Sequence, residues 1–207
     1  MIITSVERNK KNKDRLSIYI DNQYSFSVSE ADYLSLNLYE LREITEDEII
    51  NIKENINFRS AKAAAIRYLS LKFRSEKEVA VKLENEGYDS ETISKVVEEL
   101  KAMGYINDSL YVQKYIFDRS KLKPRSKRML KYELLSKGIA ENIIDDALAE
   151  WQMDDYAVAE NLVKRKFGKY DLYDDKTIKK IYSFLHHRGF NYEIISRVIN
   201  NITKRTV

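Results

Sequence analysis

The chain has 207 residues, of which 43% are hydrophobic and 33% charged. The charged share exceeds the typical ~25%, so we expect a high ratio of surface to core. Five Gly, one Pro and no Cys disfavour a Gly-rich nucleotide loop, a β-sandwich and a thiolate site, and they favour helices.

Charge and hydropathy also indicate where the protein works. Residues 1–57 carry a net charge of −4, whereas residues 58–207 carry +7. This asymmetry favours a polyanionic partner for the second part of the chain. The sequence has no apolar run of the ~18 residues that a membrane span needs, and no apolar signal region follows Met1. We therefore expect a cytoplasmic protein without a membrane partner.

The first 57 residues predict a small strand-rich module with helices. Apolar and polar residues alternate over 16–20 and again over 24–28, and Asp21-Asn22 between them tolerate the positive φ of a tight hairpin. A third strand is expected over 2–6, followed by a loop over 9–14. A hairpin alone is marginally stable, so helices over 30–36 and 45–58 are expected to cover one face.

From residue 58 the chain is predicted to be helical and repetitive. Gly87, Gly138 and Gly189 are separated by 51 residues twice, and each is preceded by Leu at four residues. Such a glycine is typical of a helix end that needs a left-handed residue. The residue types that cap helix N-termini recur twelve residues before each glycine: Ser75, Ser126 and Thr177.

The periodicity predicts three three-helix repeats, with helices at 58–72, 76–86 and 90–103 in the first. The predicted domains are therefore 1–57, 58–108, 109–152 and 153–207. The fold class is mainly α, with three tandem three-helix repeats in an elongated array and a small N-terminal sheet.

No motif for chemistry is present. The glycines are isolated, so the chain has neither a phosphate-binding loop nor a dinucleotide fingerprint. The only histidines, His186 and His187, are adjacent and cannot jointly hold a metal on one helix face. We predict a non-enzyme with no cofactor, no metal and no catalytic residue.

A basic stretch in the second repeat is the strongest functional signal. Seven cationic residues lie within 13 positions with no acid between them, and Pro124 interrupts the helix there. The stretch consists of Arg119, Lys121, Lys123, Arg125, Lys127, Arg128 and Lys131. Because helix N-termini attract anions, this pattern predicts a phosphate site at the start of the helix after Pro124. We expect Arg125, Lys127 and Arg128 to be exposed.

The other two repeats carry corresponding cations. Those in the third are Lys164, Arg165, Lys166, Lys176, Lys179 and Lys180, and those in the first are Arg74 and Lys77. A solvated polar surface is the alternative interpretation of such runs. The chain also has 15 tyrosines, whose helical spacing favours buried anchors over base-stacking residues.

Several motifs resemble those of the bacterial RecX family. The two most specific are Arg-Ser-Glu-Lys-Glu-Val at 74–79 and Gly-Tyr-Ile-Asn-Asp at 104–108. The others are Tyr68-Leu69-Ser70, Tyr111, Ser126-Lys127-Arg128, Glu133-Leu134 and Lys137-Gly138-Ile139. The resemblance is close over 58–152 and rests on the repeat pattern over 153–207 and on the strand-rich extension over 1–57. Val112 and Arg125-Ser126 depart from the family pattern.

The resemblance implies tandem three-helix repeats and a non-enzymatic regulator of recombination and DNA repair. Such a protein binds the RecA–DNA filament, inhibits RecA ATP hydrolysis and strand exchange, and binds single- and double-stranded DNA without sequence preference. We expect a monomer. A helix-turn-helix transcription regulator and a pure protein scaffold are the alternatives, and the salt and sequence dependence of DNA binding separates the three.

Overall fold

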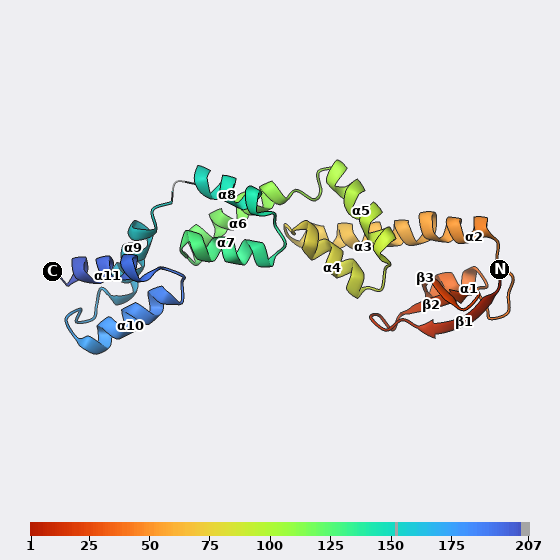
Figure 1. Ribbon diagram of the computed structural model, residues 1–207, viewed down its shortest axis with the longest axis horizontal. Coiled ribbons are helices and arrows are strands. Elements are labelled where there is room, and N and C mark those ends of the chain that lie inside the picture. Colours follow the sequence, from red (N-terminus) through yellow and green to blue (C-terminus); the bar gives the residue numbers. More distant parts are fainter. Residues whose placement is uncertain (152, 204–207) are drawn as a thin grey trace. The chain divides into compact units, whose positions relative to one another are not determined.

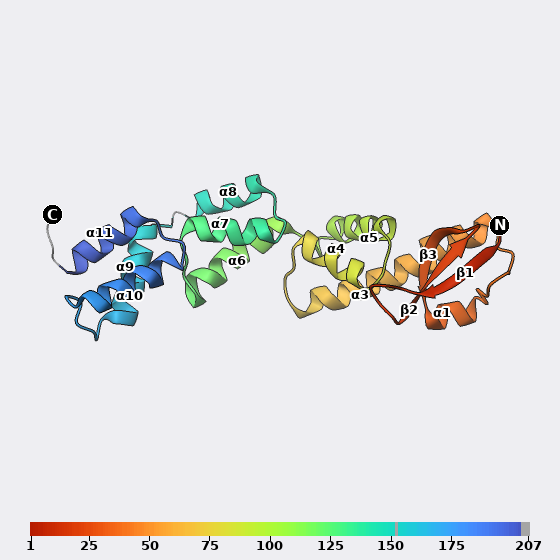
Figure 2. The ribbon, with the colours of Figure 1, turned by 60° about the horizontal axis from the view of Figure 1, so that its bottom comes forward.

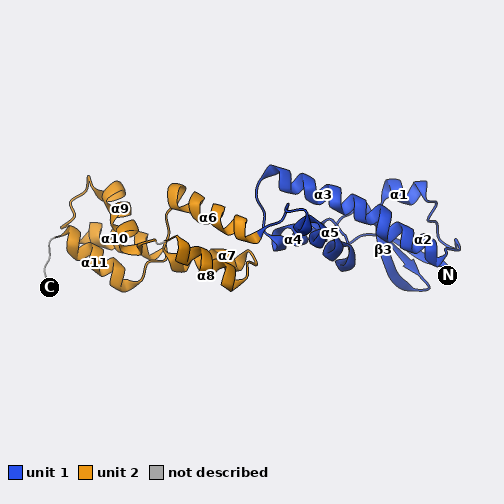
Figure 3. Cartoon of the chain, turned by 90° about the horizontal axis from the view of Figure 1, so that it is seen from above, with its two compact units in different colours: residues 1–107 blue, residues 108–207 orange. Residues whose placement is uncertain are grey.

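The computed structural model describes residues 1–151 and 153–203, and it divides into two compact units, 1–107 and 108–207 (Figures 1 and 3). The predicted fold class is confirmed in that the chain is mainly helical, with a small antiparallel sheet at its N-terminus. Four separate clusters of buried residues form the cores, two in each unit. Each cluster draws its buried residues from one predicted module.

The N-terminal sheet has three strands in the order β1 (Ile3–Arg8), β2 (Arg15–Ile20) and β3 (Gln23–Ser29), as Figure 2 shows. Both neighbouring pairs are antiparallel, with Ile18 opposite Phe26. The turn between β2 and β3 has φ values of +48° at Asp21 and +66° at Asn22, which confirms the predicted hairpin. The predicted loop over 9–14 joins β1 to β2.

One face of this sheet is covered by helices. Ser29 caps α1 (Glu30–Ser35), and Thr45 forms a capping box with Glu48 at the start of α2 (Glu46–Asn51). The core beneath them is apolar and consists of Ile3, Leu16, Ile18, Ile20, Phe26, Val28, Leu38, Ile44 and Ile52. These helices supply the cover that an isolated hairpin lacks.

A continuous helical segment links the sheet module to the first repeat. It consists of α2, a π-helical segment η1 (Ile52–Asn57) and α3 (Phe58–Leu71). The predicted boundary between residues 57 and 58 therefore lies inside a helix and is not a linker. The physical reason is that no Gly or Pro occurs between residues 46 and 71 to end the helix.

The second face of the sheet packs against the first repeat through a buried arginine. Arg15 is 5% exposed, and its guanidinium lies 4.0 Å from the centre of the Tyr88 ring. Its Nη2 also donates to the Ser27 carbonyl and, at 3.0 Å, to Oδ1 of Asn57. Burial lowers the pKa of Arg15. This side chain ties β2, β3 and the helical segment to the turn after the first repeat's second helix.

The first repeat is completed by α4 (Glu76–Asn85) and α5 (Ser90–Ala102). Ser75 and Glu78 form the capping box at the start of α4. The three helices enclose Ala61, Ala64, Ala65, Val79, Leu83, Tyr88, Val96, Val97, Leu100 and Ile106. The helix bounds agree with those predicted within one residue.

The second unit contains the other two repeats. The second repeat consists of α6 (Asp108–Leu122), α7 (Lys127–Ser136) and α8 (Glu141–Glu150), and the third of α9 (Asp155–Phe167), α10 (Asp175–His186) and α11 (Tyr192–Ile202). The predicted glycine turns are confirmed, because φ is +84° at Gly87, +81° at Gly138 and +88° at Gly189.

One predicted cap is wrong. Ser75 and Ser126 cap α4 and α7, but Thr177 lies in the first turn of α10. The cap of α10 is Asp174, whose carboxylate accepts hydrogen bonds from the backbone of Lys176 and Thr177 and from the Thr177 hydroxyl. A carboxylate three residues earlier starts this helix sooner than the repeat pattern predicts.

The second and third repeats meet at a close backbone contact. The backbone N–H of Ser126 donates to the Arg188 carbonyl at 3.1 Å. A Cβ added at Gly189 would lie 2.5 Å from Cβ of Met129 and 2.7 Å from Oγ of Ser126. Only glycine therefore fits the turn that touches the start of α7.

This contact predicts unequal costs for two glycine substitutions. Gly189→Ala combines a left-handed backbone with a steric clash, so we expect it to lower the free energy of unfolding by about 3 kcal/mol. Gly104 has φ +76° but nothing within 4 Å of an added Cβ, so Gly104→Ala should cost about 1 kcal/mol. Urea denaturation followed by circular dichroism measures both. Equal losses would contradict the proposed tight contact at Gly189.

Candidate nucleic-acid interface

The predicted basic stretch occupies the end of α6, the following loop and the first turns of α7. Its residues do not form a uniform cationic surface, because acids from elsewhere in the unit reach several of them. Each part of the stretch has a different electrostatic environment. Those environments decide which cations are available to an external ligand.

Glu133 on α7 holds two of the predicted arginines. Its carboxylate lies 3.2 Å from Nε of Arg119 and 2.8 Å from Nε of Arg125. The Tyr115 hydroxyl donates to Glu133 at 2.6 Å and accepts from Nη2 of Arg119 at 2.9 Å. Burial, followed by the Glu133 hydrogen bond, raises the pKa of Tyr115. Arg125 is thus an internal ion-pair partner with a side chain 25% exposed, and the expectation that it is exposed is wrong.

A third arginine borders this cluster. Arg188 follows α10, and its guanidinium lies 4.4 Å from the centre of the Phe184 ring. Burial lowers the pKa of Arg188, and the positive charge of Arg125 lowers it further. No sequence pattern marked Arg188, because it lies 57 residues after Lys131, the last residue of the basic stretch, and outside any run of cations.

Lys131 also forms ion pairs with acids of its own repeat. Its Nζ lies 2.6 Å from Asp145 and 2.7 Å from Glu141, both on α8. These hydrogen bonds, that of Asp145 first, raise the pKa of Lys131. The lysine links two helices of its own repeat.

The predicted phosphate site at the start of α7 already holds an anion of the chain. The backbone N–H of Lys127 donates to the Asp155 carboxylate at 3.0 and 3.3 Å, and Ser126 caps the N–H of Met129. Burial raises the pKa of Asp155, whereas the Lys127 N–H and ammonium oppose that change. An external phosphate is therefore not needed to satisfy this helix end, which corrects the prediction.

Three cations of the stretch remain available. Lys121, Lys123 and Arg128 are exposed and pair with no acidic side chain among the residues that the structure describes. Lys127 is half-buried and lies beside Asp155. The prediction that Arg125, Lys127 and Arg128 are exposed is thus confirmed for Arg128 and wrong for Arg125 and Lys127.

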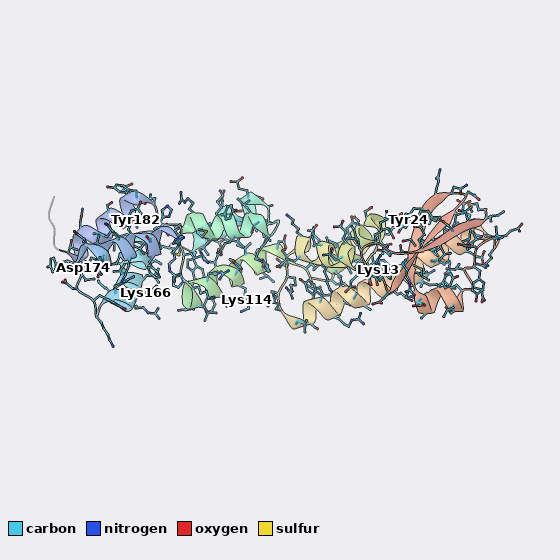
Figure 4. All side chains as sticks on the ribbon, turned by 90° about the horizontal axis from the view of Figure 1, so that it is seen from below. Lys13, Tyr24, Lys114, Lys166, Asp174 and Tyr182 are labelled. Carbon is cyan, nitrogen blue, oxygen red and sulfur yellow. The ribbon has the colours of Figure 1, made fainter. Side chains whose placement is uncertain are left out.

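The third repeat presents cations on α9 and α10. Lys164 pairs with Glu160 at 2.7 Å. The Nζ of Lys166, a residue labelled in Figure 4, lies 4.1 Å from the centre of the Phe184 ring. The remaining predicted cations are exposed: Arg165, Lys176, Lys179 and Lys180.

The first repeat contributes less. Arg74 is half-buried, with its guanidinium 3.9 Å from the centre of the Tyr68 ring, and Lys77 is exposed. This stacking holds the Arg74 guanidinium against Tyr68 on α3. Arg74 therefore contributes to packing as well as carrying a positive charge.

The described residues include no group of three or more His, Asp or Glu side chains that could hold a metal ion. In residues 1–151 and 153–203, no helix combines the length and apolar character that crossing a bilayer requires.

Comparison with known proteins identifies this architecture. Family models match all four modules: the regulatory protein RecX N-terminal domain over 1–45, and the RecX first, second and third three-helix domains over 61–100, 107–148 and 154–199. The fold thus defines a protein of tandem three-helix domains with a strand-containing N-terminal domain. The chain belongs to the RecX family of regulatory proteins.

Individual relatives agree with this assignment. Proteins named Regulatory protein RecX from Clostridium beijerinckii and Clostridioides difficile are 32% and 33% identical, over 97% of this chain and 95% of theirs. The crystal structure of RecX from Lactobacillus salivarius is 27% identical with a TM-score of 0.61, over 72% of this chain and 98% of that one. A second crystal structure of regulatory protein RecX, 24% identical with a TM-score of 0.60, shares the fold over 95% of this chain and 98% of its own.

The Glu133 cluster predicts a specific stability effect. Glu133→Gln removes the carboxylate that pairs with Arg119 and Arg125, so we expect a loss of about 1–3 kcal/mol in the free energy of unfolding. Glu141→Gln is the matched control, because Glu141 is 65% exposed and Lys131 keeps Asp145. Urea unfolding of both variants measures the difference. A control that loses as much stability as Glu133→Gln would contradict the role of Glu133.

Asp155 predicts a pH effect with a defined sign. Burial raises its pKa above the ordinary value of 3.8, so between those two pKa values the folded state binds more protons than the unfolded state. The stability that this proton contributes is present at low pH and is lost as pH rises through the folded pKa. The free energy of unfolding of the wild type minus that of Asp155→Asn should therefore fall as pH rises from below 4 toward 7. A difference that rises over this range would mean that pairing outweighs burial at Asp155.

Proposed function

We propose that the protein binds the RecA–DNA filament and inhibits RecA ATP hydrolysis and strand exchange. Membership of a family of regulatory proteins supports a regulatory role, and the RecX resemblance supports RecA as the partner. The chain acts without catalysis of its own, by occupying sites on the filament. As a tandem array it contacts more than one RecA protomer, so inhibition occurs below one molecule per protomer.

The observation that carries the DNA-binding part is the set of exposed cations in the second unit that have no acidic partner among the described residues. Lys121, Lys123 and Arg128 come from the second repeat, and Arg165 and Lys179 come from the third. Long cationic side chains on a helix end, in a loop and on two helix surfaces can contact phosphates. Such contacts do not distinguish one base from another. DNA binding is therefore independent of sequence and strongly weakened by salt.

A transcription regulator that reads duplex sequence is less well supported. Direct readout needs Asn, Gln or Arg side chains presented together on one helix in the major groove. On α7, Arg128 is exposed, but Lys131 is held by α8 and Arg125 before the helix is held by Glu133. The cations left on this helix are too few to specify a sequence.

The available cations predict the effect of a triple variant. Replacing Lys121, Lys123 and Arg128 with Ala should weaken binding to single-stranded DNA and reduce inhibition of RecA ATPase. Each lost phosphate contact reduces the slope of log affinity against log salt by about 0.7, so the slope should flatten by about 2. Fluorescence anisotropy with a labelled oligonucleotide at several salt concentrations measures this slope.

A triple variant in the other unit is the matched control. Lys10, Lys13 and Arg59 are exposed and lie in the part of the chain with net negative charge or directly after it, so their replacement with Ala should leave the slope unchanged. Circular dichroism should show unchanged helix content in both variants. If the Lys121, Lys123 and Arg128 variant keeps full inhibition of RecA ATPase and the full salt slope, the basic stretch is only a solvated surface and does not contact DNA.

A further inference from the structure

A pocket of about 360 Å³ lies in the second unit where the second and third repeats meet. Its volume falls in the range of roughly 300–1,000 Å³ that is typical of small-ligand sites. The pocket is lined by the end of α6 and the loop after it, by residues between α8 and α9, and by α9. The lining residues are Ser120, Pro124, Trp151, Met153, Val158, Asn161, Leu162 and Arg165. The pocket shares Leu162 with the core of the third repeat and Arg165 with the proposed phosphate contacts.

One of the side chains that line the pocket is the indole of Trp151. Trp151 is 36% exposed, although it is the largest apolar side chain of the chain. Its ring meets Phe117 edge to face, with centroids 6.2 Å apart and an interplanar angle of 83°. This contact fixes the indole without burying it. Exposed indole surface in a pocket is a platform on which a flat ring can stack.

The surroundings of the pocket are cationic. Arg165 lines it from α9. Lys121 directly follows the lining residue Ser120, and its Nζ lies 5.8 Å from the centre of the Phe117 ring, which contacts Trp151. No acidic residue is among those that line it. Ser120 and Asn161 add a hydroxyl and an amide, which together can donate and accept hydrogen bonds.

We infer that the Trp151 pocket binds an unstacked nucleobase of single-stranded nucleic acid, with Arg165 and Lys121 holding the neighbouring phosphates. A flat heteroaromatic ring matches the indole and Met153, and its polar edge matches Asn161 and Ser120. Positive charge at an apolar pocket that no acidic residue lines favours a polyanion that carries aromatic groups over an uncharged or basic protein segment. The inference rests on the proposed DNA binding and adds a preference for single strands, because bases in a duplex are stacked and paired.

The chain's own fluorescence tests this proposal. Trp151 is the only tryptophan, so its emission reports this pocket alone. Titrating the full-length protein with a thymidine oligonucleotide should quench the emission. An abasic oligonucleotide of the same length carries the same phosphates without bases. It should bind about 5- to 100-fold more weakly in an anisotropy competition and leave the emission unchanged.

Variants separate stacking from charge. Trp151→Ala should weaken binding of the thymidine oligonucleotide to the level of the abasic one, whereas Trp151→Phe, which keeps an aromatic ring and the contact with Phe117, should restore most of it. Arg165→Ala should weaken binding of both oligonucleotides. Lys114→Ala is the control, because Lys114 is exposed on α6, pairs with Asp118 and does not line the pocket, so binding and quenching should persist.

The outcomes are distinguishable. Equal affinity for both oligonucleotides with unchanged emission would overturn the nucleobase site and leave the proposed DNA binding intact. Failure of every oligonucleotide to bind would remove the proposed DNA binding itself. Emission that changes on adding RecA without DNA, but not on adding an oligonucleotide, would assign the pocket to a protein side chain and overturn the inference.

Discussion

The contact between the turn at Gly189 and the start of α7 is the constraint on which the second unit depends. Ser126 uses its hydroxyl to cap α7 and its backbone N–H to bind Arg188 across the repeat boundary. Each three-helix repeat has a small core of its own. The hydrogen-bonded and closely packed contact between the second and third repeats therefore helps to fix the position of one repeat against the other. Asp155, which binds the next N–H of the same helix end, strengthens the junction from the third repeat.

This junction also redistributes the charge of the basic stretch. It brings Arg188 close to Arg125 and supplies the Asp155 carboxylate to Lys127. Glu133 then holds Arg125 within the fold. Part of the positive charge thus stabilises the repeats, and the rest remains at the surface for phosphates. A stretch that is purely cationic along the sequence is mixed in space, which lowers the cost of gathering like charges.

The two units have different polar organisation. In the first, Arg15 is buried between the sheet and Tyr88, without a carboxylate partner among the described residues, and stabilises an internal contact. In the second, cations without an acidic partner among the described residues include Arg165, which lines the same pocket as the exposed Trp151 indole. The proposed division assigns nucleic-acid contact to the second unit, where phosphate binding and base stacking lie side by side.

The sequence by itself determined the repeats, the hairpin and most helix bounds, because glycine turns, capping residues and apolar periodicity act over a few residues. The domain boundary predicted at residue 57 lies inside a continuous helical segment, because nothing there stops the helix. The cap predicted at Thr177 is wrong, because Asp174 caps α10. Only the tertiary structure decided which cations are free, because Glu133, Asp145 and Asp155 reach them from other turns and helices. The Glu133 motif was visible in the sequence, but its pairing depends on distances that no local pattern encodes. The Trp151 pocket likewise exists only where two repeats meet.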